Sequence, residues 1–318
     1  MDAKFWGIGR HESTIMDPQQ RLFLEHAWQA VEHSGYAPRT GLSDELVGVF
    51  AACGIDGYLV HHQDGGALKS PMEPGDLFLT EVGNEKDYIA TRVSYLMNLQ
   101  GPSMTVNTAC SSGLVAVAQA VQSIQTGSCD VAIAGASSIT FPNLGYRYQP
   151  GLVNSIDGLV KPFDQEAQGT VFGDSVGAVV LKRLDAAIED GDHIWGVVKG
   201  SAVSNDGAQK AGYSAPSPQG QASAITTAFQ TGDINPASLS YVECHCTGTV
   251  VGDGLEIRGL HEAFKSYPET SGMESCAIGS VKGNIGHANC AAGITGLIKT
   301  LCMMKNKTLV PTANFKSL

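Results

Sequence analysis

The sequence predicts an α/β fold, because segments with the pattern of buried strands alternate with segments of helical periodicity along most of the chain. The composition agrees with this class. Only 16% of the 318 residues are charged and 38 are glycine, which is typical of a compact protein with a large core and many tight turns. A chain of this length exceeds the usual size of a single core, so we expect two domains or one large layered unit.

The net charge and the cysteine content limit the classes of function and the cell compartments that we expect. The formal net charge of -11 argues against a general nucleic-acid binder, because attraction to phosphate requires a basic face. Eight cysteines are scattered through the chain without a secretory signal, so we expect reduced thiols in the cytoplasm. No apolar stretch is long enough to span a bilayer, and we expect no membrane association.

The first long helix is expected directly after Asp17. This aspartate is suited to cap the helix, Pro18 suits its first position, and Gln20 lies three residues after the cap. Apolar residues follow at helical spacing until Gly35, where the helix should end.

Strands are expected wherever short apolar runs are bounded by turn residues. In chain order these runs cover residues 46–52, 103–107, 130–136, 170–182, 194–204, 241–244 and 277–280. Helical patterns occupy the segment that begins near Cys110, residues 219–231 and residues 290–304. A strand, a turn and a helix of small residues therefore occur twice, around Cys110 and from 277 to 304, which predicts a loose internal duplication. No linker separates the two halves, so we expect them to be interlocked.

Cys110 is the strongest candidate for a reactive residue. It lies where a strand pattern turns into a helix of small and aliphatic residues. A helix N-terminus carries unpaired N–H donors and the positive end of the macrodipole, which favours a thiolate over a thiol. The sequence therefore predicts a nucleophilic cysteine at this position.

Two histidines lie downstream in glycine-rich surroundings. His245 is followed by a Thr-Gly-Thr run at 247–249, and His287 ends a Lys-Gly-Asn-Ile-Gly-His run that begins at Lys282. Cys244 and Cys246 flank His245, but a second pair at zinc-site spacing is missing, so we expect no metal. The run at 279–286 lacks the Gly-Lys-Ser or Gly-Lys-Thr ending of a nucleotide loop and is not interpreted as one.

Five motifs together resemble β-ketoacyl synthases. They are Asp-Pro-Gln-Gln-Arg at 17–21, Gly-Pro-Ser at 101–103, Thr-Ala-Cys-Ser-Ser at 108–112, His-Cys-Thr-Gly-Thr at 245–249 and Ser-Val-Lys-Gly-Asn-Ile-Gly-His at 280–287. Three further runs, at 87–95, 161–164 and 205–207, look like the ketosynthase domains of modular type I polyketide synthases. The resemblance covers nearly the whole chain.

The resemblance implies a thiolase-like fold, with two similar βαβαβ halves in a layered αβαβα arrangement. Residues 1–190 would form the N-terminal half, which carries the nucleophilic cysteine. Residues 191–318 would form the C-terminal half, which carries both histidines and is incomplete at its end. Members of this family are usually homodimers, and other polyketide synthase domains are further expected partners.

The resemblance also implies the reaction, an acyl transfer in polyketide or fatty acid biosynthesis. Cys110 would accept an acyl group from an acyl carrier protein, because a thiolate is a soft nucleophile that holds acyl groups well. A malonyl-type extender on a carrier would lose carbon dioxide, and His245 and His287 would stabilise the enolate. By resemblance, Lys282 orders the two histidines.

Binding of the extender would involve a phosphopantetheine arm that the carrier protein supplies. By resemblance, Thr247 and Thr249 bind this arm. The chain itself is expected to bind no cofactor and no metal. The reaction would be a decarboxylative Claisen condensation without an external reductant.

The sequence departs from the family at four places. Cys246 stands where the family usually has glycine, and Gly254 where it usually has proline. If the glycine serves a positive φ, Cys246 adds strain beside His245. The family also has a strand before the point where Met1 stands and a Gly-Phe-Gly-Gly type loop after Phe315, so we expect a member truncated at both ends.

Two functions therefore stay open from the sequence. The first is an active condensing enzyme of the β-ketoacyl-[acyl-carrier-protein] synthase type. The second is a truncated ketosynthase-like module that binds a carrier protein or partner subunit with little or no condensing activity. Cys110 and both histidines favour the first, whereas the missing loop favours the second, because loss of one oxyanion donor typically costs roughly a hundredfold in rate.

Overall fold

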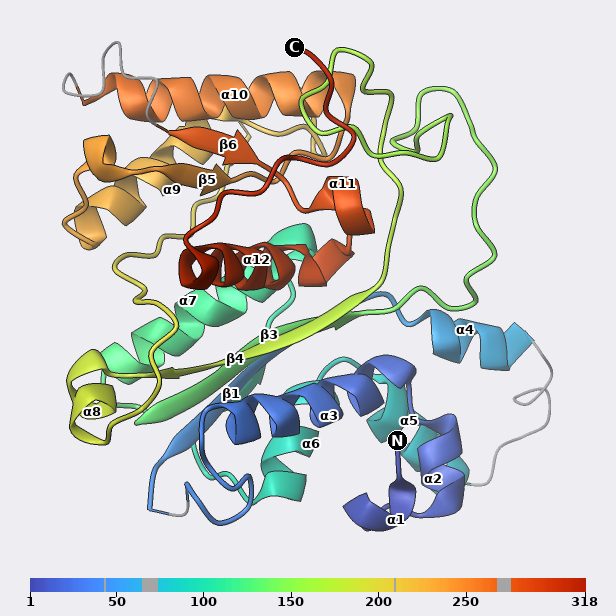
Figure 1. The fold of residues 1–318 in the computed structure, drawn as a ribbon. Coiled ribbons are helices and arrows are strands. Elements are labelled where there is room, and N and C mark those ends of the chain that lie inside the picture. Colours follow the sequence, from blue (N-terminus) through green and yellow to red (C-terminus); the bar gives the residue numbers. More distant parts are fainter. Residues whose placement is uncertain (43, 65–73, 209, 268–275) are drawn as a thin grey trace. The chain divides into compact units, whose positions relative to one another are not determined.

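The computed structural model describes residues 1–42, 44–64, 74–208, 210–267 and 276–318 (Figure 1). These residues form two compact units, each built from three separate stretches of the chain. The first unit comprises Met1–Tyr146, Gly173–Ile194 and Ala288–Thr295. The second comprises Arg147–Phe172, Trp195–His287 and Gly296–Leu318. Within the described ranges, no helix is both long and apolar enough to cross a membrane.

A four-stranded sheet forms the centre of the first unit, in the order β2-β1-β3-β4. The strand β1 (Val47–Cys53) runs parallel to β2 (Ser103–Thr105) and to β3 (Val131–Ser138), and β4 (Ser175–Lys182) pairs antiparallel with β3. Both β1 and β3 are buried along their whole length. Continuous burial is typical of central strands that are covered on both faces, and their unbroken apolar runs made them predictable.

Helices cover both faces of this sheet. Figure 1 shows α7 (Ser112–Gln125) on one face, and α3 (Pro18–His33) and α6 (Tyr88–Met97) on the other. The remaining helical segments of the first unit are α1 (Ala3–Trp6), α2 (Arg10–Ile15), α4 (Gly57–Asp64), α5 (Pro74–Asn84), η1 (Ala109–Ser111), α8 (Leu184–Glu189) and η4 (Asn289–Ala291). The sheet is therefore enclosed between helices on both faces.

The structure confirms the predicted helix after Asp17. The Asp17 carboxylate accepts a hydrogen bond of 2.7 Å from the backbone N–H of Gln19, and Pro18 occupies the first helical position. Phe23 and Leu24 are fully buried in the hydrophobic core of the first unit. Gly35 follows the helix with φ 93°, a conformation that glycine adopts without a side-chain clash.

The second unit contains the shorter sheet. Its strands β5 (Tyr241–Glu243) and β6 (Ala277–Gly279) are parallel. Its helical segments are α9 (Pro218–Thr231), η2 (Pro236–Ser238), α10 (Val250–Lys265), α11 (Lys282–Ile285) and most of α12 (Ala292–Asn306). Both strands lead directly into loops that carry predicted site residues.

Two predicted strands differ from the structure. Residues 194–204 are not a strand, because in the described part of the chain they form no ladder with another segment. The predicted strand at 170–182 is shorter and begins only at Ser175. Before it, Thr170 and Phe172 each form a single bridge, to Asn154 and to His287. A run of apolar and β-branched residues is thus not enough to form a strand, because a strand also needs a neighbouring segment that pairs with its backbone groups.

The predicted repeat of strand, turn and helix is present. A 3₁₀ turn, η1 in one case and η4 in the other, precedes the helices α7 and α12. The residue that opens each turn has a positive φ, 54° at Ala109 and 42° at Asn289. The two turns pack against each other in the first unit. Gly113 permits this approach, because a Cβ there would lie 2.9 Å from the carbonyl oxygen of Cys290.

Candidate active site

Cys110 is the middle residue of the first turn, η1, directly before α7. Two serines shape the turn by hydrogen bonds. The hydroxyl of Ser112 accepts from the backbone N–H of Thr108 at 2.8 Å and donates to the carbonyl of Ala109 at 2.7 Å. The hydroxyl of Ser111 donates to the carbonyl of Thr108 at 2.7 Å. The Thr-Ala-Cys-Ser-Ser motif therefore builds a self-supporting turn that leaves Cys110 partly exposed.

The two predicted histidines meet in the second unit. His245 follows β5 by two residues, and His287 lies between α11 and η4. Their ring centroids are 5.2 Å apart, and the ring planes are nearly perpendicular, at 85°. His287 is buried, stacks on Phe172 and donates its backbone N–H to the carbonyl of Val171 at 2.7 Å. In the part of the chain that the structure describes, its Nδ1 has no hydrogen-bond partner.

Lys282 and Glu256 hold the backbone of His245 from opposite sides. The buried Lys282 donates its ammonium to the carbonyl oxygen of His245. The Glu256 carboxylate accepts from the backbone N–H groups of His245 and Cys246, each at 2.6 Å. A positive and a negative side chain thus fix the backbone of this short loop.

Both imidazoles are biased towards the neutral form. Burial lowers the pKa of His287 to about 4, and the nearby Lys282 ammonium adds to the shift. The pKa of His245 is also lowered, by desolvation first and then by Lys282 and His287. His245 keeps contact with solvent, which weakens the desolvation, but the Lys282 charge acts in the same downward direction. Neutral imidazoles can donate or accept a hydrogen bond without carrying charge.

The Cys246 backbone has the strained conformation that its replacement of glycine predicted. Its φ is 21°, and its side chain is buried. Its thiol donates to Asp253 at 3.0 Å. The same carboxylate accepts from the backbone N–H of Gly248 at 3.1 Å and from that of Phe163 at 2.9 Å. Asp253 therefore ties the loop after His245 to the loop at 160–164.

The predicted pantetheine-binding threonines lie on this loop. The hydroxyls of Thr247 and Thr249 are 3.1 Å apart and hydrogen-bond each other. Both residues are half-buried, and Thr249 precedes α10 without capping it. Neither hydroxyl is consumed by the helix end, so both keep capacity for a ligand.

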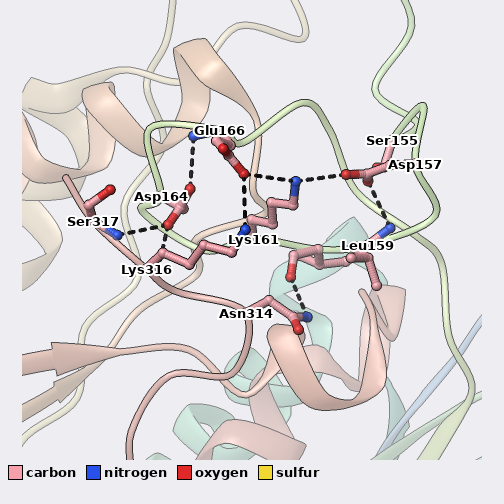
Figure 2. A network of polar contacts seen from close by, with 10 residues as sticks. Ser155, Asp157, Leu159, Lys161, Asp164, Glu166, Asn314, Lys316 and Ser317 are labelled. Carbon is pink, nitrogen blue, oxygen red and sulfur yellow. Dashed lines mark hydrogen bonds and ion pairs between the residues drawn. The ribbon is translucent and has the colours of Figure 1, made fainter.

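Asp164 anchors a second loop of the same unit, and Figure 2 shows its contacts. Its carboxylate accepts backbone N–H groups from Glu166, Lys316 and Ser317 at 2.6–3.0 Å. These bonds hold the pKa of Asp164 below its usual value. Lys161 forms an ion pair of 2.7 Å with Asp157 in the same network (Figure 2). The 161–164 motif therefore fixes the backbone that brings Phe163 to Asp253.

The structure brings five predicted residues together within one unit and places the sixth in the other. His245, His287, Lys282, Thr247 and Thr249 belong to the second unit, and Cys110 belongs to the first. Asp253 and Glu256 were not predicted as site residues from the sequence. Both lie on α10, four and seven residues after Thr249, and their carboxylates face the loop rather than solvent. An acidic pair in the first turns of a helix after a glycine-rich loop was the available signal.

Two family models together match nearly the whole chain. The model of the β-ketoacyl synthase N-terminal domain matches residues 1–187, and that of the C-terminal domain matches residues 195–316. The chain belongs to the β-ketoacyl synthase family. The fold is accordingly the thiolase-like α/β fold, as predicted.

Curated relatives of this synthase are much longer proteins. One of the subunits of the phenolphthiocerol/phthiocerol polyketide synthase of Mycobacterium tuberculosis is 47% identical over 99% of the chain, which spans 21% of the relative. Polyketide synthase PksN of Bacillus subtilis is 42% identical over 97% of the chain, which spans 6% of that protein. The ketosynthase therefore matches a limited part of each.

Solved structures of ketosynthases agree with the fold. Ketosynthase twelve of the bacillaene polyketide synthase of Bacillus amyloliquefaciens has a TM-score of 0.91 and 36% identity. The match covers all of this chain and 55% of that one. The oxazolomycin ketosynthase domain of Streptomyces albus gives a TM-score of 0.88 at 33% identity, again over the whole chain and 53% of that domain.

Proposed function

We propose that this ketosynthase catalyses a decarboxylative Claisen condensation, in polyketide or fatty acid biosynthesis, between a Cys110-bound acyl group and a malonyl-type extender on an acyl carrier protein. The observation that carries the proposal is the histidine pair, with 5.2 Å between the ring centroids, beside the buried Lys282. Such a pair suits an acyl-transfer step that develops negative charge on oxygen and needs no redox group.

Acyl transfer is the first half of the reaction. The Cys110 sulfur attacks the thioester carbonyl of an acyl-carrier, and the carrier's phosphopantetheine thiolate leaves. The partly exposed Cys110 at the start of α7 supports this role, because the turn presents the side chain instead of packing it. A thioester to Cys110 then holds the growing chain.

Decarboxylation and bond formation make up the second half. The bond between the α-carbon and the carboxylate breaks, carbon dioxide leaves, and the electron pair moves to the thioester oxygen. N–H groups of His245 and His287 stabilise that oxygen, and the unpartnered Nδ1 of His287 leaves capacity in its ring. The enolate carbon next attacks the Cys110 thioester, and the Cys110 thiolate is released with a β-ketoacyl-carrier product.

Lys282 would act on both rings. After burial, its charge is the next cause that lowers the pKa of both histidines, and its ammonium holds the carbonyl of His245. Thr247 and Thr249 would bind the phosphopantetheine arm through their hydroxyls. No other cofactor or metal enters the proposed reaction.

The proposed partners are an acyl carrier protein, other polyketide synthase domains and a second copy of the chain. In the first unit, β2 pairs with β1 and lies at the edge of the sheet, which supports a homodimer because an edge strand has backbone groups free to pair. We further propose residues 1–190 and 191–318 as the two ketosynthase halves, in the cytoplasm. The family matches change between residues 187 and 195, which supports this division.

The proposal is tested by two readouts on the purified chain. Incubation with an acyl-carrier thioester should add the acyl mass to the Cys110 peptide, and malonyl-carrier should then release carbon dioxide and give the β-ketoacyl product. Acylation without carbon dioxide release would identify the second candidate function, a module that binds a carrier but condenses poorly. If the chain shows no acylation and no release of carbon dioxide, both candidate functions are contradicted.

A further inference from the structure

The carboxylate of Glu243, which lies two residues before His245 in the sequence, accepts three hydrogen bonds. Its Oε2 accepts the Tyr241 hydroxyl at 2.5 Å and the Lys299 ammonium at 2.7 Å. Its Oε1 accepts the backbone N–H of Val281 at 2.6 Å. The Lys299 ammonium also donates to the Tyr241 hydroxyl at 2.9 Å. Glu243 and Lys299 are largely buried, so water screens this pair little.

These contacts join the elements that carry the site. Tyr241 and Glu243 lie on β5, Val281 precedes α11, and Lys299 lies on α12. The helix α12 has room for the carboxylate because residue 296 is glycine, where a Cβ would lie 3.0 Å from the Glu243 Cγ. Burial raises the pKa of Tyr241, so its hydroxyl stays a donor to Glu243.

The position of Val281 links this network to Lys282. The Glu243 carboxylate fixes the amide one residue before Lys282, and Glu243 itself lies two residues before His245. The Lys282 ammonium binds the carbonyl of His245, so both ends of that contact are held close to Glu243.

We propose that Glu243, held by Tyr241 and Lys299, is a positioning residue that keeps the Lys282 ammonium on the carbonyl of His245. This proposal rests on the proposed function and adds to it a residue that acts through Lys282. Within the second unit, the charged groups around the two imidazoles are Lys282 of α11 and, behind the His245 backbone, Glu256 and Asp253 of α10. Each imidazole is also the titratable neighbour of the other.

The decisive variant replaces both members of the buried pair, E243Q/K299M. It removes one negative and one positive charge, so the net charge near the histidines is unchanged and no lysine is left buried without a partner. The single variant E243Q serves as the second test. The matched control is E262Q/K265M, which removes the exposed ion pair between Glu262 and Lys265 on α10.

We expect the double variant to release carbon dioxide at least about tenfold more slowly, as for loss of one charge-assisted hydrogen bond, while acylation of Cys110 stays at the parent rate. The imidazole pKa of His287, followed by the NMR shift of its ring protons, should rise towards the ordinary value of about 6.5. The apparent pKa of the low-pH limb in the pH profile of carbon dioxide release should rise together with the pKa of His287. A merely structural role would lower acylation and release together without moving either pH profile.

Two results would overturn the proposal. One is an E243Q/K299M variant, folded by circular dichroism, with the parent's release rate and His287 titration. The other is an E262Q/K265M control whose release rate and His287 pKa change as much as those of E243Q/K299M. If the parent chain neither takes up acyl groups nor releases carbon dioxide, the proposed function fails, and the His287 titration still decides whether Glu243 positions Lys282.

Discussion

The turns around Cys110 and Cys290 have the same backbone and different surroundings. Each begins with a residue of positive φ, contains a cysteine in the middle of a 3₁₀ turn and leads into a helix. Cys110 is partly exposed, whereas Cys290 is 4% exposed and its thiol donates to the carbonyl of Ser137 at 3.2 Å. Burial raises the pKa of Cys290 to about 11. The turn alone therefore does not make a nucleophile.

The second turn contributes in another way, because His287 lies three residues before Cys290. The repeated unit thus offers a cysteine in one copy and a histidine in the other. In the second copy the cysteine is buried, and the loop before it holds His287, for which we propose a role in decarboxylation.

The sharpest test of this comparison exchanges the two cysteines for alanine. Cys110→Ala should abolish uptake of an acyl group from the carrier thioester, while Cys290→Ala should keep it, because only the first thiol is presented by its turn. Mass spectrometry of tryptic peptides locates the added acyl group. Uptake by the Cys110→Ala variant at the parent's level would disprove the assignment of the nucleophile.

Removal of His287 tests the contribution of the second turn. His287→Ala should slow carbon dioxide release from malonyl-carrier by about a hundredfold or more, since one donor to the developing oxyanion is lost. Acylation of Cys110 should change little. His261→Ala, on an exposed position of α10, is the control and should match the parent. Equal loss of acylation and release would contradict a role specific to the extender.

The raised pKa of Cys290 predicts a pH dependence of stability. The folded state holds the thiol proton up to about pH 11, whereas an unfolded cysteine loses it near pH 9, so stability is fully present below pH 9 and falls as the pH rises through 11. Two pKa units correspond to roughly 2–3 kcal/mol. Urea unfolding between these pH values should show this loss in the parent and a smaller one in Cys290→Ala. If the free energy of unfolding falls equally with pH in the parent and in Cys290→Ala, the assigned burial of the thiol is contradicted.

The contact between the turns predicts the smallest effect. Gly113→Ala should destabilise the protein by about 1–3 kcal/mol, because the new Cβ would lie 2.9 Å from the carbonyl of Cys290. Gly254→Ala, a site in α10 with open space around its Cβ position, should instead be neutral or stabilising by up to about 1 kcal/mol. The melting temperatures of both variants are compared with that of the parent. Equal changes in melting temperature would argue against a tight contact between the turns.

Much of the site was predictable because each residue lies within a short motif. Cys110, Lys282 and His287 could be named from their neighbours, and the strain at Cys246 followed from its place in a glycine position. Asp253 and Glu256 were not named, because their place in the first turns of a helix does not by itself distinguish a carboxylate that binds a loop from one that faces solvent. Their partners are backbone N–H groups of another segment, which only folding brings within reach.

The sequence by itself determined the family, the α/β class and the long helices, and it named the candidate site residues, because periodicity and motifs are local properties of the chain. Tertiary structure decided which apolar runs become strands, as residues 194–204 show, because a ladder requires a second segment. It also decided that Cys290 is buried, that burial and Lys282 lower the pKa of both histidines, and that Glu243 meets Lys299. Burial and charge at a side chain depend on groups distant in sequence, and those distances are set only by packing.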